Sequence, residues 1–319
     1  MTRLRVATRR SALARAQATQ TAKRIAGDDY ELVPLATTGD REPDRAIGDF
    51  DAKGLFVDAL REAVLAGDCD IAVHSYKDLP TAPVDDLVVG AVPPRGDPRD
   101  LLVTREGHQL GELPRLATVG TSSERRRVQL LRARPDLQVL PVRGNLDTRL
   151  RKVVDGEFDA AVVALAGLQR LYVDEADGGV GPFTLPLAGA PLEPGVLLPP
   201  PAQGALAVEC RSDDAATLQR LAAVDDATAR AQVTAERAFL ATVGGGCTAP
   251  IGALAHEPAT GHIEVAGMLA DPDRRVVLRR SWRGALRDPA AVGRELAEAM
   301  LSGGGQDLVD AVAGRQQGR

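Results

Sequence analysis

The residue best placed for unusual chemistry in this chain is Cys247, which follows three glycines in the segment Gly244–Pro250. Those glycines leave the backbone free to adopt positive φ angles and allow a bulky group to approach closely. A cysteine on such a loop can be a nucleophile, an anchor for a covalently bound group, or an ordinary half-buried thiol, because free cysteines mostly behave as small hydrophobic residues. The loop by itself leaves all three interpretations open.

A second reactive pair, Lys77 and Asp78, follows the predicted strand at 70–73, and Pro80 stops any regular continuation of the chain. Lysine is scarce here: it makes up four of the 39 basic residues, and the other 35 are arginine. A solvated surface turn is the simplest interpretation of an adjacent Lys-Asp pair. Its place beyond the carboxyl end of a strand also suits a functional site.

Arginines gather where predicted strands end and predicted helices begin. Arg125, Arg126, Arg143 and Arg149 all lie near such junctions on one predicted edge of a sheet, and Arg9 and Ser11 lie at a similar junction near the N-terminus. Backbone N–H groups and the helix dipole attract anions there. Guanidinium groups bind carboxylates through paired, charge-assisted hydrogen bonds. A solvated helix face also explains the run at 125–127, but the combined pattern predicts a site for a small polyanion.

Strands and helices that alternate along the chain predict the scaffold for these residues. The first α/β unit has predicted strands at 4–8, 30–36, 70–73 and 87–92, with helices at 11–26 and 54–66; the second has strands at 100–104, 117–120, 137–142 and 159–164, with helices after 123, 143 and 164. The polar stretch 37–53 is long for a loop and predicts a mobile lid. A Pro-rich segment, 191–201, returns the chain to a strand at 205–210, where Cys210 is expected in the core.

The remaining chain predicts a smaller unit of a different kind. Two helices after 213 lead to the glycine–cysteine loop, and strands follow near 251–255, 263–270 and 276–282, then helices near 289–301 and 306–313. Consecutive strands followed by helices indicate an antiparallel α+β unit. The chain is therefore expected to fold as two α/β units and one small α+β unit.

Composition narrows the functional class. A net charge of -5 and only 3% aromatic residues argue against a nucleic-acid protein that reads phosphates through the arginines at 125–127. The three cysteines lack C-x-x-C spacing, so neither a disulfide framework nor a metal site is expected. No apolar stretch is long enough to span a bilayer, and no signal-peptide pattern opens the sequence. We expect a cytoplasmic protein.

Nine segments, taken in order, resemble the porphobilinogen deaminase (hydroxymethylbilane synthase) family along the whole chain. They are ATRRSALARAQA (7–18), KGLFVDAL (53–60), DIAVHSYKDLP (70–80), GTSSERRRVQL (120–130), RGNLDTRL (143–150), AGLQRL (166–171), QGALAVECR (203–211), ERAFL (236–240) and GGCTAPIG (245–252). Each segment is moderate support alone. Nine in register form a very specific pattern.

The resemblance implies two doubly wound domains of the periplasmic-binding-protein kind, with the site between them. The first would comprise residues 1–94 and 195–212, and the second residues 99–190. A third, α+β domain would comprise residues 218–319. It implies a dipyrromethane cofactor joined to Cys247 by a thioether. On this primer a monomeric transferase would condense four porphobilinogen molecules, releasing ammonia from each, and hydrolysis would then free hydroxymethylbilane. The implied partner is this small molecule, with neither nucleic acid nor membrane.

The resemblance also assigns roles to individual residues. Asp78 matches the catalytic carboxylate, which would stabilise positive charge on the pyrrole nitrogens, and Arg9 and Arg143 match positions tied to catalysis. Positions matched to cofactor binding are Lys77, Ser75, Thr121, Ser123, Arg125, Arg126 and Gly144, and those matched to substrate binding are Ser11, Gln17, Arg149, Arg170 and Gln203.

The chain departs from the family pattern at three places: Asp49 stands where many members have lysine, Gly244 where an acid is frequent, and Tyr76 where Met or Leu is frequent. The expected lid behaviour is therefore not carried over from the family. The alternative function is a non-catalytic, receptor-like protein that binds anions between two domains. Such a protein would need neither the cysteine nor the Lys-Asp pair.

Overall fold

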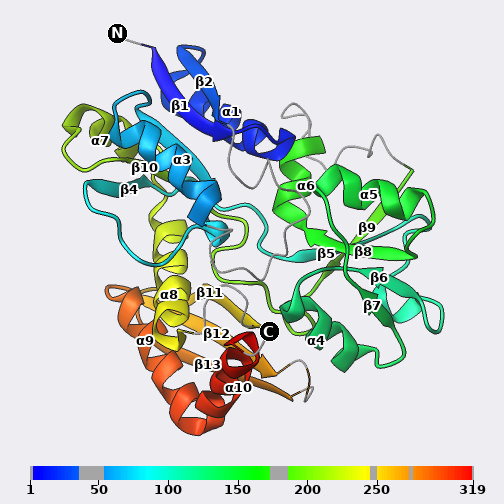
Figure 1. Cartoon of the computed structure of the whole chain (residues 1–319). Helices are drawn as coiled ribbons and strands as arrows, with labels where there is room; N and C mark the ends of the chain where they lie inside the picture. Colours follow the sequence, from blue (N-terminus) through cyan, green and yellow to red (C-terminus); the bar gives the residue numbers. More distant parts are fainter. Residues whose placement is uncertain are drawn as a thin grey trace. The chain divides into compact units, whose positions relative to one another are not determined.

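A computed structural model describes residues 3–35, 54–172, 186–244, 250–271, 273 and 276–317 (Figure 1). The predicted lid at 37–53 and Cys247 lie outside the described residues. The chain divides into two compact units, one of residues 1–96 with 204–231 and the other of residues 97–203 with 232–319. The first unit contains one sheet and the second contains two. The three-domain boundaries expected from the sequence stay a prediction.

The first unit is built on a five-stranded sheet in the order β2-β1-β3-β10-β4. Its strands are β1 (Leu4–Arg9), β2 (Tyr30–Leu35), β3 (Ile71–Ser75), β4 (Leu87–Ala91) and β10 (Leu206–Arg211). Parallel β1, β2 and β3 are connected by crossovers, whereas β10 runs antiparallel to both β3 and β4. The returning strand β10 therefore joins this sheet between two strands from much earlier in the chain.

Helices cover both faces of this sheet, because successive strand residues point to opposite sides. On one face Val6, Ile71 and Val208 pack with Ala18 of α1 (Ala12–Ala26) and Leu221 of α7 (Ala215–Ala222). On the other face Ala7 and Ala72 pack with Leu60 and Val64 of α3 (Gly54–Leu65). Apolar residues on both sides of each strand are typical of such a two-faced sheet.

The second five-stranded sheet has the order β7-β6-β8-β5-β9. Its strands are β5 (Asp100–Thr104), β6 (Thr118–Gly120), β7 (Gln138–Leu140), β8 (Ala160–Ala164) and β9 (Ala188–Leu192). The helix α4 (Glu124–Ala133) packs on one face, and α5 (Leu146–Val154) with α6 (Leu165–Tyr172) on the other. Here β5 runs antiparallel to β8 and β9, as β10 does beside β3 in the first sheet. The two five-stranded sheets therefore have the same arrangement of strands, with one antiparallel strand in the fourth position.

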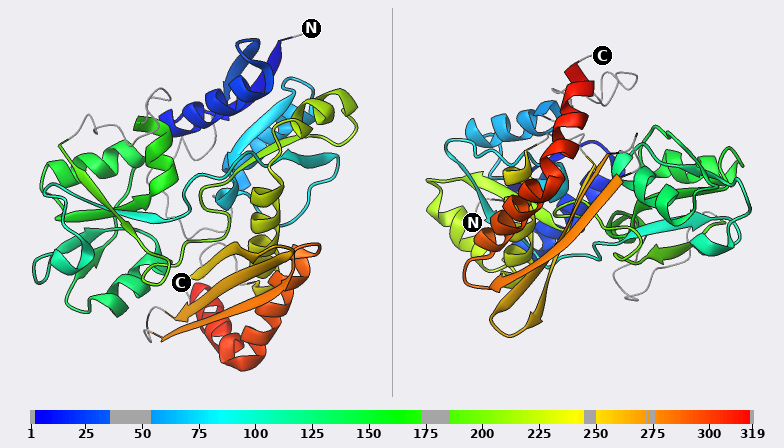
Figure 2. Two further views of the ribbon diagram at one scale, coloured as in Figure 1. Left: turned by 180° about the vertical axis from the view of Figure 1, so that it is seen from behind. Right: turned by 90° about the horizontal axis from the view of Figure 1, so that it is seen from below.

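A three-stranded antiparallel sheet, β11 (Ile251–Ala259), β12 (His262–Asp271) and β13 (Val276–Ala285), forms the α+β part. The helices α8 (Ala227–Val243) and α9 (Pro289–Met300) lie on the same face of it (Figure 2), and a kink at Leu301–Gly305, where Gly303 and Gly304 leave helical backbone angles, leads to α10 (Gln306–Gln317). Close packing requires glycine on β12, since a Cβ at Gly267 would lie 2.9 Å from Phe239 of α8 and from Leu296 of α9. The predicted fold class, two α/β domains and a small antiparallel α+β domain, is confirmed.

One strand differs from the sequence-based expectation. The strand β9 was not predicted, because Gly189 and Pro191 disfavour a strand, but β9 is an edge strand, where proline is tolerated. The pair Lys77 and Asp78 lies in a 3-10 turn, Tyr76–Asp78, directly after β3, in keeping with the turn expected there. In the described part of the chain, no helix is long and apolar enough to cross a membrane.

Candidate functional site

The predicted site residues fall into two groups, one in each compact unit. The first unit holds Arg9, Ser11, Gln17, Ser75, Lys77 and Asp78. The second holds Thr121, Ser123, Arg125, Arg126, Arg143, Gly144, Arg149, Arg170 and Gln203.

The first group gathers at the carboxyl ends of β1 and β3, which are parallel neighbours. The chain leaves β1 toward β2 on one side, and then crosses back to β3 on the other, so the strand order reverses between them. Ligands of open α/β sheets bind in the crevice at this reversal. Arg9 ends β1, and Ser11 caps α1 by accepting a hydrogen bond from Ala14 N at 3.4 Å.

The turn that carries Lys77 and Asp78 is held at both of its ends. Ser75 Oγ donates to the buried Gln17 Oε1 at 3.1 Å, and Tyr76 N donates to Ala205 O at 3.1 Å. Asp78 is exposed, whereas Lys77 is half-buried. The structure thus presents an accessible carboxylate on a turn that is tied to α1 and to the chain entering β10.

The second group begins where β6 passes into α4. Ser123 is the N-cap of α4 and accepts a hydrogen bond from Arg126 N at 3.4 Å, while Ser123 N donates to Thr121 Oγ1 at 3.3 Å. The strand order of this sheet also reverses, between β6 and β8. The site therefore combines a strand-order reversal with a helix N-terminus, which attracts anions.

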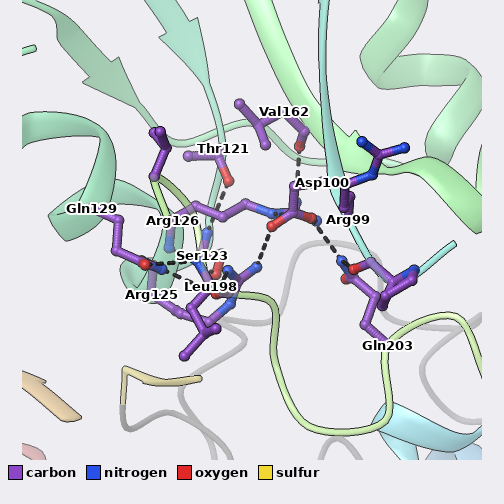
Figure 3. Close-up of polar contacts among 12 residues, drawn as sticks. Arg99, Asp100, Thr121, Ser123, Arg125, Arg126, Gln129, Val162, Leu198 and Gln203 are labelled. Carbon is purple, nitrogen blue, oxygen red and sulfur yellow. Dashed lines mark hydrogen bonds and ion pairs between the residues drawn. The ribbon is translucent and has the colours of Figure 1, made fainter. Parts of the chain in front are cut away.

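Arg125 and Arg126 are buried, so a solvated face is the wrong interpretation for these two residues. Both donate to Asp100, which is fully buried (Figure 3): Arg125 Nη2 lies 2.8 Å from Oδ2, and Arg126 Nη2 lies 2.6 Å from Oδ1. Arg127 does lie partly in solvent and pairs with Glu124 at 3.0 Å. The first two arginines of the run are thus held inside the domain, and the third lies on its surface.

Arg149 adds a third positive charge near this pair. Its Nε donates to Gly144 O at 2.8 Å, and burial, together with the charge of Arg126, lowers the pKa of Arg149. Gly144 has a φ of 104°, which favours glycine at the turn into α5. Three arginines and one carboxylate leave an excess of positive charge, which an anionic ligand would neutralise.

The other predicted residues occupy different surroundings. Arg143 is exposed just before α5, and Arg170 is half-buried on α6. Gln203 is completely buried, and its Nε2 donates to Asp100 Oδ1 at 3.0 Å and to Pro98 O at 2.8 Å. A residue assigned to substrate binding therefore orients the carboxylate that holds the arginines.

Sequence reasoning missed Asp100. Burial by itself would raise the pKa of Asp100, but the guanidinium groups of Arg126 and Arg125 outweigh it and hold the pKa well below its usual value. The available signal was an acid at the head of the otherwise apolar strand Asp100–Thr104. A charge that enters a buried strand needs partners of opposite sign.

The described cysteines are structural. Cys69 and Cys210 are fully buried, and burial raises the pKa of both thiols, that of Cys210 to about 11. Of the loop before Cys247, the described residues include Gly244, whose φ is 71°. Cys247 itself stays a sequence-based prediction.

Two family models match the chain. The model described as "Porphobilinogen deaminase, dipyromethane cofactor binding domain" matches residues 4–219, and "Porphobilinogen deaminase, C-terminal domain" matches residues 230–302. The first match includes both five-stranded sheets, and the second includes the three-stranded sheet.

Curated relatives are similar over nearly the full length. A porphobilinogen deaminase of Acidothermus cellulolyticus is 46% identical over 97% of this chain and 91% of its own length. One from Nocardia farcinica is 47% identical over 99% of this chain and 91% of its own length. Among solved structures, the periplasmic VFT2 domain of Bordetella pertussis BvgS has 17% identity and a TM-score of 0.34, covering 69% of this chain and 86% of that domain.

Proposed function

The chain belongs to the porphobilinogen deaminase family, and on that premise we propose how its residues perform the family's reaction. The activity is that of a hydroxymethylbilane synthase, a transferase of tetrapyrrole biosynthesis, and the cofactor is dipyrromethane. Porphobilinogen molecules are condensed head to tail with release of ammonia, and hydrolysis frees the linear product. When bound, the cofactor supplies the terminal pyrrole to which the first substrate molecule is added.

Cys247 carries the cofactor in this proposal. The glycine-rich sequence around it suits the attachment of a bulky group. The other two cysteines support the assignment by their burial, since Cys69 and Cys210 are inaccessible and hold their thiols protonated at neutral pH. A thioether to either of them would require a ring system inside a close-packed core.

The observation that carries the proposal is the excess positive charge around Asp100. Each pyrrole ring of the cofactor and of the substrate brings an acetate and a propionate, so the ligand becomes more negative at every addition. Arg125 and Arg126 share a single carboxylate, Arg149 adds its charge near Arg126, and these groups can bind further carboxylates through charge-assisted hydrogen bonds. The residues of the second group thus fit a dipyrromethane with carboxylate side chains.

Asp78 is the catalytic carboxylate in this assignment. Loss of ammonia from porphobilinogen leaves positive charge that the pyrrole nitrogen shares. A carboxylate held at a fixed place stabilises such charge as it develops. Asp78 is exposed on a turn whose neighbours Ser75 and Tyr76 are hydrogen-bonded, so it can meet a substrate while keeping its place.

The remaining residues bind and orient the carboxylates of the ligands. Arg9 and Arg143 act during condensation, and Lys77 and the hydroxyls of Ser75, Thr121 and Ser123 hold the cofactor with Gly144. Substrate contacts are assigned to Ser11, Gln17, Arg149 and Arg170, whereas Gln203, which is completely buried, acts on the ligands through Asp100. The protein acts as a cytoplasmic monomer, and neither nucleic acid nor a membrane takes part.

Intact mass tests the proposal directly. Purified protein should be heavier than its sequence by two pyrrole units, and Cys247→Ser should have the mass of the bare chain. Cys69→Ser and Cys210→Ser are the matched controls, and both should retain the added mass where they fold. Active protein with the mass of the bare chain would contradict a covalent cofactor. Active protein that retains the added mass in Cys247→Ser would contradict its attachment site.

A further inference from the structure

The fully buried carboxylate of Asp100 stands in the middle of a group of residues assigned to bind carboxylates (Figure 3). An acid there repels an anionic ligand, so its presence needs a physical reason. Asp100 is the first residue of β5, and β5 runs antiparallel to β8. Asp100 therefore lies opposite Ala164, at the carboxyl end of β8. The N-terminus of α4 lies at the same edge of the sheet.

The geometry around Asp100 fixes two guanidinium groups relative to each other. Oδ1 accepts from Arg126 Nη2 at 2.6 Å and from Nε at 3.2 Å, and Oδ2 accepts from Arg125 Nη2 at 2.8 Å. The far ends are also held: Arg126 Nη1 donates to Val162 O at 2.8 Å, and Arg125 Nη1 donates to Leu198 O at 2.6 Å. Five hydrogen bonds therefore set the place of both groups before any ligand arrives.

The charges support a role toward a ligand rather than simple neutralisation. One carboxylate compensates one of the two guanidinium charges, so the buried pair keeps a net positive charge, and Arg149 adds to it. Without Asp100, two like charges would repel each other inside the domain, and the side chains would turn toward water. Each arginine has five N–H groups, ten in all, and the bonds described above use five of them. Within the described residues, the other five have no acceptor.

We propose that Asp100 is a positioning residue, which holds Arg125 and Arg126 in the arrangement that receives the cofactor's carboxylates. The inference rests on the proposed function. A preformed pair binds its ligand without first losing side-chain freedom, which improves affinity. Gln203 contributes to the same arrangement, because its Nε2 donates to Asp100 Oδ1 at 3.0 Å and thereby orients the carboxylate.

The test measures how fast the protein without cofactor acquires it, called loading below, rather than how fast the enzyme turns over. Protein made in a host that cannot produce porphobilinogen is mixed with porphobilinogen, and its intact mass is followed over time, well below the melting temperature of each variant. In Asp100→Asn, which has nearly the same shape but no charge, loading should slow by about tenfold or more, since misplaced binding groups cost rates of this order. Asp100→Glu restores the charge and should load faster than Asp100→Asn.

Asp97→Asn is the matched control. Asp97 lies three residues earlier, and its carboxylate pairs with Arg99 at 2.7 Å rather than with Arg125 or Arg126. It should load at the wild-type rate, whatever stability it loses. If Asp100 had only a structural role, Asp100→Asn would melt at a lower temperature but would gain cofactor at the wild-type rate when measured below that temperature. That result would overturn the proposal.

A second variant keeps the test decisive where Asp100→Asn does not fold. Gln203→Met removes the hydrogen bond to Oδ1 and keeps every charge, so loading should slow by a few fold. Loading at the wild-type rate in this variant would then overturn the inference. Failure of the wild-type protein itself to gain mass would instead contradict the proposed function, so the two failures are distinguishable.

Discussion

Glu209 on β10 and Arg61 on α3 form a two-bond ion pair inside the first unit, with Nε to Oε2 at 3.0 Å and Nη2 to Oε1 at 2.8 Å. His74 Nε2 lies 3.1 Å from the same carboxylate. All three residues are buried. Because β10 returns from far along the chain, this cluster joins it to a helix and a strand of the N-terminal segment.

The Glu209 cluster predicts how stability depends on pH. Burial alone would raise the pKa of Glu209, but His74 and Arg61 outweigh it and lower the pKa from 4.5 to about 2. The folded-state pKa lies below the unfolded one, so the stabilisation is present above about pH 5 and is lost as the pH falls toward 2. The free energy of unfolding should fall by about 3 kcal/mol across this range from this group.

Urea unfolding of Glu209→Gln, measured from pH 7 to pH 2, checks this prediction. The variant should be destabilised by about 3 kcal/mol or more at pH 7, since Arg61 loses its partner, and its stability should depend less on pH below 5. Glu157→Gln is the control, because Glu157 pairs with Lys152 on the surface and should change stability by less than about 1 kcal/mol. An unchanged pH dependence in Glu209→Gln would contradict the assignment.

Asp78→Ala should lose nearly all turnover while it keeps its fold and its cofactor. Removing one preorganised charge-stabilising group typically lowers the rate by roughly 10²–10³. Because Asp78 is exposed, we expect the melting temperature to change little. Turnover and intact mass are measured on the same sample, with Asp58→Ala, an exposed acid on α3, as the control. Near wild-type turnover in Asp78→Ala would refute its catalytic role.

Gly144→Ala should weaken substrate binding through Arg149. The φ of 104° is strained for alanine, and a Cβ would lie 2.7 Å from Thr148 Cβ, so the turn must move. Its carbonyl accepts from Arg149 Nε, and the guanidinium should move with it. We expect KM for porphobilinogen to rise several fold. Gly156→Ala has a comparable φ of 76° beyond the other end of α5, and its Cβ would make only an ordinary contact, 3.7 Å from Arg105 Nη1, so it should lose stability without this rise.

Gly293→Ala should destabilise the α+β part strongly. A Cβ there would lie 2.0 Å from Ala235 O and 2.9 Å from Phe239 N, both backbone atoms of α8, so α9 must separate from α8. We expect a loss of at least about 2 kcal/mol in chemical unfolding. Gly314→Ala, in α10 with no atom within 4 Å of the added Cβ, should instead stabilise by up to about 1 kcal/mol. Equal effects would contradict the close approach of α8 and α9.

Local patterns in the sequence predicted most elements and their order. Apolar periodicity identified the strand–helix junctions, and in the structure Ser11 and Ser123 are the N-caps of the helices at two of them. The strand expected at 70–73 runs instead over Ile71–Ser75, because pairing with β10 continues it to Ser75. The edge strand β9 was missed, since its glycine and proline carry no strand signal and only its pairing with β5 makes it one.

Sequence alone also placed arginine and serine at the junctions and identified the family-like motifs, because those signals lie within a few residues of one another. Only the tertiary structure decided what the arginines contact. Asp100 lies 25 residues before Arg125 and pairs with it, because an antiparallel β5 beside β8 brings the acid to the edge where α4 begins. Buried charges must find partners of opposite sign wherever the fold brings them, and sequence spacing does not record that proximity.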